Sequence, residues 1–229
     1  MNTGQYRRRM EENQRKYPCS IQGCPHPRYR MFNLCQGHAS RRQNRGHALA
    51  KGHLRIALVT PYVKKVQALV NHNEGHTGIV SALRDIAEIL AVADMKRTEP
   101  GYIQIALLND HRVDPKGILV SAAAVTCLYE LQWRESRIHN RDFLDDNHFM
   151  VQLGRVCLLL ALRQNRIALA MGTFDFPGMT GRKGVYPVYA AKMLPNNYSR
   201  FGKHLWNRAG LVLNHVAKTI ITKQMEKES

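Results

Sequence analysis

The sequence has few acidic residues and no long apolar run, and both shortages narrow the classes of protein to which it can belong. Its 229 residues hold 34 Lys and Arg against 17 Asp and Glu, a formal net charge of +17. No stretch reaches the ~18 consecutive apolar residues that a membrane span requires. The first twenty residues lack the apolar segment of a secretory signal. We therefore expect an intracellular, cytoplasmic protein with no membrane partner.

Cysteine is also scarce, and the odd total of five argues against a disulfide framework. Three cysteines lie within residues 19–35, whereas Cys127 and Cys157 stand alone in apolar stretches. A chain of this length can bury a core without crosslinks. We expect reduced thiols, with Cys127 and Cys157 acting as small buried apolar groups.

Motifs of known catalytic chemistry are missing as well. The sequence contains no Gly-x-Ser-x-Gly, no phosphate-binding glycine loop and no His-Glu-x-x-His. Asp145 and Asp146 are explained as an acidic helix start rather than as a two-metal site. The sequence thus predicts no catalytic residue and favours a binding protein over an enzyme.

The positive charge is concentrated at the two ends of the chain. Residues 1–53 hold eleven basic and two acidic side chains, and residues 182–229 hold nine and two. Residues 54–181 are nearly balanced, with fourteen and thirteen. Solvated tails would show the same bias, but it is typical of two regions that attract polyanions such as nucleic acids.

One N-terminal run has the spacing of metal ligands. Cys19, Cys24, Cys35 and His38 form the pattern Cys-x4-Cys-x10-Cys-x2-His. Two close ligand pairs separated by a loop suit a tetrahedral zinc ion, and three thiolates with one imidazole make a closed structural site. The sequence therefore predicts a Zn²⁺ cofactor.

His26 is a rival for the fourth ligand. Pro25 and Pro27 flank it and stiffen its backbone, so we favour His38. Gly23 and Gly37 each precede a predicted ligand, and we expect both to allow tight turns.

This run, followed by Arg41-Arg42, resembles the short zinc-binding segments beside HNH-type nucleases and related DNA-binding proteins of phages and mobile elements. The resemblance covers Cys19 to Arg42. It implies DNA contact close to the metal, with Arg41, Arg42 and Arg45 as candidate contacts. It also implies a bacterial or phage-infected host cell.

Apolar spacing predicts a mostly α protein, with a small N-terminal zinc module in residues 1–53 followed by a helical domain in 54–229. Residues 1–18 are a basic arm, disordered or nascently helical, and residues 39–53 a short helix and linker. Later helices are expected to start at Thr60-Pro61, Ile79, Asp114-Pro115, Asp146 and Asn197. The segment Tyr102 to Leu108 reads as a strand or a buried turn.

Residues 172–188 alternate aromatic and basic side chains among glycines. The aromatic rings can stack on unpaired bases or anchor the loop on the core. This loop and the basic start of the last helix together indicate a second contact with nucleic acid. We expect that contact on the side opposite the zinc module. A helix that is simply exposed to solvent would carry the same charges. The full set of candidate contacts is Arg28, Arg30, Arg41, Arg42, Arg45, Arg182, Lys183, Arg200 and Lys203.

Two polar clusters offer other chemistry. Asp110-His111 followed by Asp114 looks like the start of an HNH nuclease site, yet a helical pattern follows where a β-hairpin is needed. His72, Glu74 and His76 have metal-ligand spacing but lie in a predicted helix–helix turn.

The sequence therefore predicts a zinc-stabilised nucleic-acid-binding protein, with DNA favoured over RNA, acting in transcription regulation or replication of a phage or mobile element. A metal-dependent nuclease and an RNA- or ribosome-associated protein are the alternatives, the latter because the pI is near 10.1. A protein that binds the helical domain is a further candidate partner.

Overall fold

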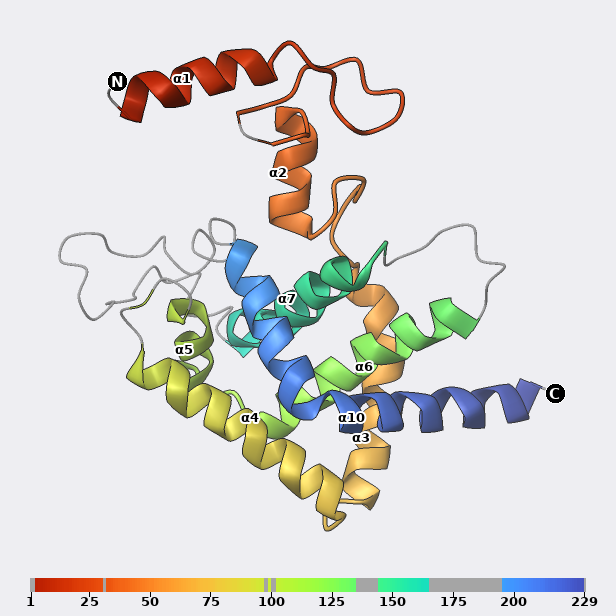
Figure 1. The fold of residues 1–229 in the computed structure, drawn as a ribbon. Helices are drawn as coiled ribbons and strands as arrows, with labels where there is room; N and C mark the ends of the chain where they lie inside the picture. The colour runs from red at the N-terminus through yellow and green to blue at the C-terminus, as the bar shows by residue number, and fades with distance from the viewer. Residues whose placement is uncertain are drawn as a thin grey trace.

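The computed structural model describes residues 3–30, 32–96, 99, 102–134, 144–164 and 195–228, and in these residues it contains eight α-helices and no strand (Figure 1). The prediction of a mostly α protein is confirmed. The loop 172–188, with Arg182 and Lys183, lies outside the described residues. The helices are α1 (Thr3–Gln14), α2 (Gln36–Arg45), α3 (Ile56–His72), α4 (Thr77–Met95), α5 (Ile103–Asp110), α6 (Pro115–Arg134), α7 (Asp146–Gln164) and α10 (Pro195–Glu228).

The core of the helical domain is built around α6, whose residues Ile118 to Cys127 are all buried. Apolar side chains surround this helix on every side, as expected for a helix at the centre of a bundle. Helices α3, α7 and α10 pack against it, and α4 closes the bundle against α10 (Figure 1). None of the described helices is both long and apolar enough to cross a bilayer.

Helices α7 and α10 cross with their backbones in contact. A Cβ atom on Gly154 would overlap the carbonyl of Tyr198, and one on Gly202 would overlap the carbonyl of Met150. Only glycine permits so close an approach. The crossing fixes the first turns of α10 on α7.

The expected start of α3 at Thr60-Pro61 is wrong, because the helix begins at Ile56 with Arg55 as its N-cap. Thr60 donates its hydroxyl to the carbonyl of Ile56, and Pro61 lies inside the helix. Val59 is 1% exposed. Burial of apolar residues before the proline therefore outweighs the local start signal.

The expected strand or turn at Tyr102 to Leu108 is also wrong, because the segment forms α5. Ile105 and Leu108 are fully buried, on a helix packed against α4 and α7. Short apolar runs do not distinguish strand from helix by periodicity alone. The predicted starts of α4, α6 and α7 agree with the structure within two residues, and Asp114 accepts from the backbone N–H of Lys116 as expected for a cap.

The segment from Arg45 to Leu54, here called the linker, joins the N-terminal module to the helical domain. Gln152 of α7 is 0% exposed and holds both ends of the linker. Its Oε1 accepts from the N–H of Leu54 at 2.8 Å, and its Nε2 donates to the carbonyl of Arg45 at 3.4 Å. Arg155 adds a bond to the carbonyl of Leu54. The division at residues 53–54 stays a prediction.

Candidate metal centre

The first pair of predicted ligands lies in a short hairpin-like loop. The N–H of Cys19 donates to the carbonyl of His26, and that of Arg28 donates to the carbonyl of Tyr17, both at 3.0 Å. At the turn, Gly23 has φ +75, which confirms its expected role. The N–H of Cys24 then bonds to the carbonyl of Ile21, so both sulfurs end on one side of the loop.

The second pair belongs to the start of α2. Cys35 is the N-cap of this helix, and His38 follows three residues later on the same face. Gly37 lies between them in regular helix, and its φ is not positive. The turn expected at Gly37 is therefore wrong: helical spacing alone brings Cys35 and His38 together.

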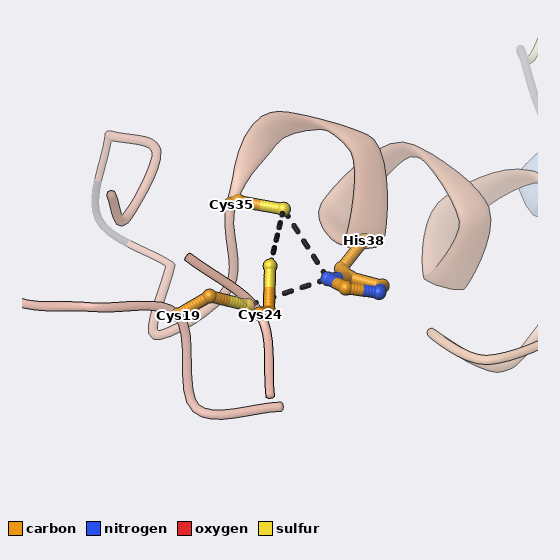
Figure 2. Close-up of side chains that lie close together, drawn as sticks. All are labelled: Cys19, Cys24, Cys35 and His38. Carbon is orange, nitrogen blue, oxygen red and sulfur yellow. Dashed lines mark hydrogen bonds between the residues drawn. The ribbon is translucent and has the colours of Figure 1, made fainter. Parts of the chain in front are cut away.

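The four predicted residues converge on one point (Figure 2). Their ligand atoms all lie within 4.8 Å of one another. The Cys24 and Cys35 sulfurs are 3.8 Å apart, and Nδ1 of His38 lies 3.4 Å from the Cys19 sulfur and 3.2 Å from the Cys35 sulfur. Zinc bond lengths in a tetrahedron give edges of about 3.8 Å between sulfurs and about 3.6 Å between sulfur and nitrogen. The cluster has the size of a metal site.

His26 does not belong to this cluster. Its backbone carbonyl accepts from the N–H of Cys19, its side chain is exposed, and its ring is not among the ligand atoms that converge. Of the two rival histidines, the structure brings His38 to the sulfurs.

The electrostatics of the cluster favour a bound cation. Burial disfavours the Cys19 thiolate, but hydrogen bonds from the backbone of Ile21 and Cys35, and from the His38 side chain, prevail and lower its pKa to about 6. At Cys24 a backbone bond from His26 lowers the pKa, but burial and the adjacent sulfurs together raise it. Without a metal, the site thus stabilises the thiolate of Cys19 and disfavours a second thiolate at Cys24. A bound cation would offset the repulsion between adjacent thiolates.

The apolar core of this module is very small. It consists of Leu34, Ala39 and Ala48 together with the sulfurs of Cys19 and Cys35. A core of this size does not support folding alone, so metal binding would contribute directly to the folding of the module.

Several arginines lie in the loop and the helix that carry the predicted metal ligands. Arg41 and Arg42 are exposed on α2, and Arg30 is exposed on the loop with its guanidinium 5.0 Å from the centre of the Tyr29 ring. Arg28 is half-buried, bonding the carbonyl of Pro18. Arg45 has partners within the chain, since its guanidinium donates to the carbonyls of Ala50 and Lys51 in the linker.

The basic arm forms a helix, α1, that buries no residue. It carries Arg7, Arg8 and Arg9, of which Arg7 pairs with Glu11 at 3.3 Å. The arm, the loop and α2 follow one another at the end of the molecule farthest from α4 (Figure 1).

Arg200 and Lys203 are exposed near the start of α10. This start lies beside α2, and Tyr198 meets His53 of the linker edge-on at 6.5 Å between ring centroids. The expectation that these residues lie opposite the zinc module is wrong, because the glycine crossing carries α10 back to the linker.

Sequence reasoning missed the partners of Arg200. Its guanidinium and the Lys96 ammonium lie 5.6 and 5.4 Å from the centre of the Tyr102 ring, and the His204 ring lies 6.1 Å away. No local pattern links residues a hundred positions apart. The sequence around the metal ligands has another feature: no acidic residue occurs between Glu12 and Glu74.

The two polar clusters have structural roles. Asp110 ends α5 and Asp114 caps α6, so the described residues 102–134 form helices where an HNH site needs a β-hairpin. His76 caps α4 by accepting from the N–H of Gly78, and Glu74 bonds Lys116. Among the described residues, Cys19, Cys24, Cys35 and His38 form the one group with metal-site geometry.

The chain matches no protein-family model, and neither the curated proteins nor the solved structures include one that is detectably similar to it. The function must therefore be inferred from the metal centre and from the charge around it.

Proposed function

We propose that this chain is a zinc-stabilised nucleic-acid-binding protein that prefers DNA and acts in transcription regulation or replication of a phage or mobile element. The observation that carries the proposal is the convergence of Cys19, Cys24, Cys35 and His38 in a part of the chain that is rich in arginine and has no acidic residue. The resemblance of Cys19 to Arg42 to segments of phage DNA-binding proteins supports the biological role.

The donor set supports zinc as the metal. Three thiolates and one imidazole in a tetrahedron are ligands that zinc prefers. Because the protein supplies all four ligands, no coordination position is left for a substrate. The ion would serve structure: it holds the loop against the start of α2, and thereby orders the arginines on both.

The charge supports a polyanionic ligand. Residues 13–73 carry basic side chains and no acidic one, so no internal carboxylate competes for the arginines of the loop and α2. Phosphate groups spaced along a nucleic acid suit such a surface, since each neutralised phosphate releases counterions. Exposed Arg41 and Arg42, directly after the metal ligands, are the residues expected to contribute most.

The first experiment measures metal content and binding together. Purified protein should contain one zinc per chain, and fluorescence anisotropy should show tighter binding to duplex DNA than to single-stranded DNA or structured RNA. Replacing Arg41 and Arg42 with alanine should weaken binding to every duplex and reduce the salt slope by roughly 0.9 for each phosphate that the variant no longer neutralises. Chelation of the metal should weaken binding as well.

A charge-matched control separates a specific surface from overall charge. Lys218 and Lys223 are exposed on the last turns of α10, far from α2 (Figure 1). Replacing both with alanine removes the same charge and should leave binding nearly unchanged. Equal reductions of affinity in the two double variants, or binding indifferent to salt, would contradict the proposal. Tightest binding to structured RNA would support the RNA-associated alternative, and Mg²⁺-dependent DNA cleavage abolished by His111→Ala would support the nuclease.

A further inference from the structure

The outward face of α2 consists of uncharged polar side chains. Gln36, Ser40 and Asn44 follow one another at four-residue intervals, so they share one face of the helix, and all three are exposed. The opposite face is occupied, since His38 points to the cysteines and Ala39 packs in the small core. Nδ2 of Asn44 donates to the hydroxyl of Ser40, one turn earlier on the same face, at 3.2 Å.

Gly37 lies on this face and has no structural reason to be glycine. Its φ is not positive, and a Cβ atom there would meet nothing within 4 Å. Glycine in an exposed helical turn weakens the helix relative to alanine. Gly46, the C-cap of α2, does have a structural reason to be glycine. Its φ is +90, and a Cβ atom there would meet the backbone of Asn147 and His148. The fold would accept alanine at Gly37, so the glycine leaves this face free of a side chain where a partner can approach the backbone closely.

We infer that α2 is a recognition helix that enters the major groove of duplex DNA and reads base edges with Gln36 and Asn44, while Gly37 permits close approach. The inference rests on the proposed function and adds to it: the ligand is a B-form duplex, and binding depends on sequence. Amide side chains can bond both N6 and N7 of adenine, and the major groove is wide enough for a helix.

The dimensions and the charges agree with this assignment. Gln36 and Asn44 are separated by about 12 Å along the helix axis, which matches three to four base pairs of about 3.4 Å each. Arg41 borders the face, and Arg28, Arg30 and the basic arm lie on the segments before it. These cations can hold the phosphates on either side of the groove, whereas the uncharged amides add little to non-specific attraction and are suited to discrimination.

The test begins with selection of bound sequences from a random duplex pool by the full-length zinc-loaded protein. The selected duplex and a scrambled duplex of the same composition are then compared at one salt concentration. We expect a preferred core of three to five base pairs that contains adenine. Replacing Gln36 and Asn44 with alanine should lower the preference for the selected duplex roughly five-fold or more for each base that the variant no longer reads, with little change for the scrambled duplex.

The matched control removes two exposed amides elsewhere. Gln67 on α3 and Asn207 on α10 are both exposed and lie on the helical domain. Their double replacement by alanine should leave the preference unchanged. Zinc content and helical circular dichroism of both double variants should equal those of the original protein, so that a change in preference reports on the recognition of bases.

Gly37→Ala is the sharper variant, because the inference predicts opposite effects on folding and on binding. The added methyl group should raise the midpoint of urea unfolding slightly, since alanine favours the helix. It should also weaken binding to the selected duplex by about ten-fold, because the methyl group separates α2 from the bases. Gly117→Ala on α6, where a methyl group also meets nothing within 4 Å, should leave binding unchanged.

The outcomes separate the two proposals. Binding to no nucleic acid would overturn both the proposed function and this inference. Equal binding to selected and scrambled duplexes, or a preference that survives in the Gln36 and Asn44 double variant, would overturn the recognition helix and leave the proposed function standing. Tighter binding to an RNA duplex would also overturn it, because the A-form major groove is too narrow for a helix.

Discussion

Gly46 should be the most sensitive position in the connection between the metal module and the helical domain. It ends α2 in the left-handed region with φ +90, and its N–H donates to the carbonyl of Arg42. Its own carbonyl accepts from Nδ2 of Asn147 at the start of α7. A Cβ atom on Gly46 would lie 2.8 Å from both the Asn147 carbonyl oxygen and Cα of His148, so backbone closes the space.

The cost of Gly46→Ala has two parts. An L side chain in the left-handed region costs about 1–2 kcal/mol. Forcing a methyl group against fixed backbone costs about 1–3 kcal/mol more, as overpacking does in a core. The sum of about 2–5 kcal/mol is a large share of the roughly 5–15 kcal/mol that stabilises a typical domain. For a urea m value of about 2–3 kcal/mol per molar, the midpoint should fall by about 1–2 M.

Urea unfolding followed by circular dichroism measures this shift, and zinc analysis of the same samples shows whether the metal site survives. We expect one zinc per chain in the variant, because the four ligands lie outside the contact with α7. Gly52→Ala is the matched control, since Gly52 belongs to the same linker, has no positive φ and has nothing within 4 Å of a Cβ atom. A Gly46→Ala protein with the original midpoint would refute the reasoning.

Three further changes test other parts of the structure. Cys35→Ser should abolish stoichiometric zinc binding while keeping a good N-cap residue on α2, so one zinc per chain after purification of this variant would contradict the site. Burial lowers the pKa of His148 to about 4, so an unfolded chain binds an extra proton between pH 6.5 and 4. His148 should therefore lower the free energy of unfolding as the pH drops through this range, by roughly 2 kcal/mol at pH 5, and urea titrations of His148→Gln should show a smaller dependence on pH. Gly154→Ala should prevent the crossing of α7 and α10 and lower the melting temperature sharply, whereas Gly75→Ala, where a Cβ atom meets nothing within 4 Å, should not.

The sequence predicts most of the helices because their apolar faces repeat regularly and their starts carry caps. Asp114 before Pro115 locates α6, and Asp146 locates α7. The failures have a different cause. At α3, buried residues before Pro61 extend the helix past a good local cap, and at α5 a short apolar run takes its conformation from the helices around it. In both places tertiary packing determines the secondary structure, and the local sequence pattern does not indicate it.

The metal cluster could be predicted because its ligands lie close together in the chain. Cys35 and His38 are brought together by one helical turn, and Gly23 closes the loop that carries the other two sulfurs. The surroundings could not be predicted in the same way. Gln152 holds residues about a hundred positions away, and the Tyr102 ring contacts Lys96, the C-cap of α4, and Arg200 of α10. Such pairs depend on the helix crossings of the whole domain.

Helix α2 is held at both ends, so its exposed face is ordered before any nucleic acid binds. The cysteines fix its first turn through His38, and Gly46 with Gln152 fixes its last turn on α7. A surface ordered before binding loses less conformational entropy when its ligand arrives. Removal of the metal and disruption of the packing at Gly46 should therefore both weaken the proposed binding of DNA, although neither change touches an exposed residue of α2. The losses of affinity from the two changes should not be additive, because releasing either end of α2 already makes the helix mobile.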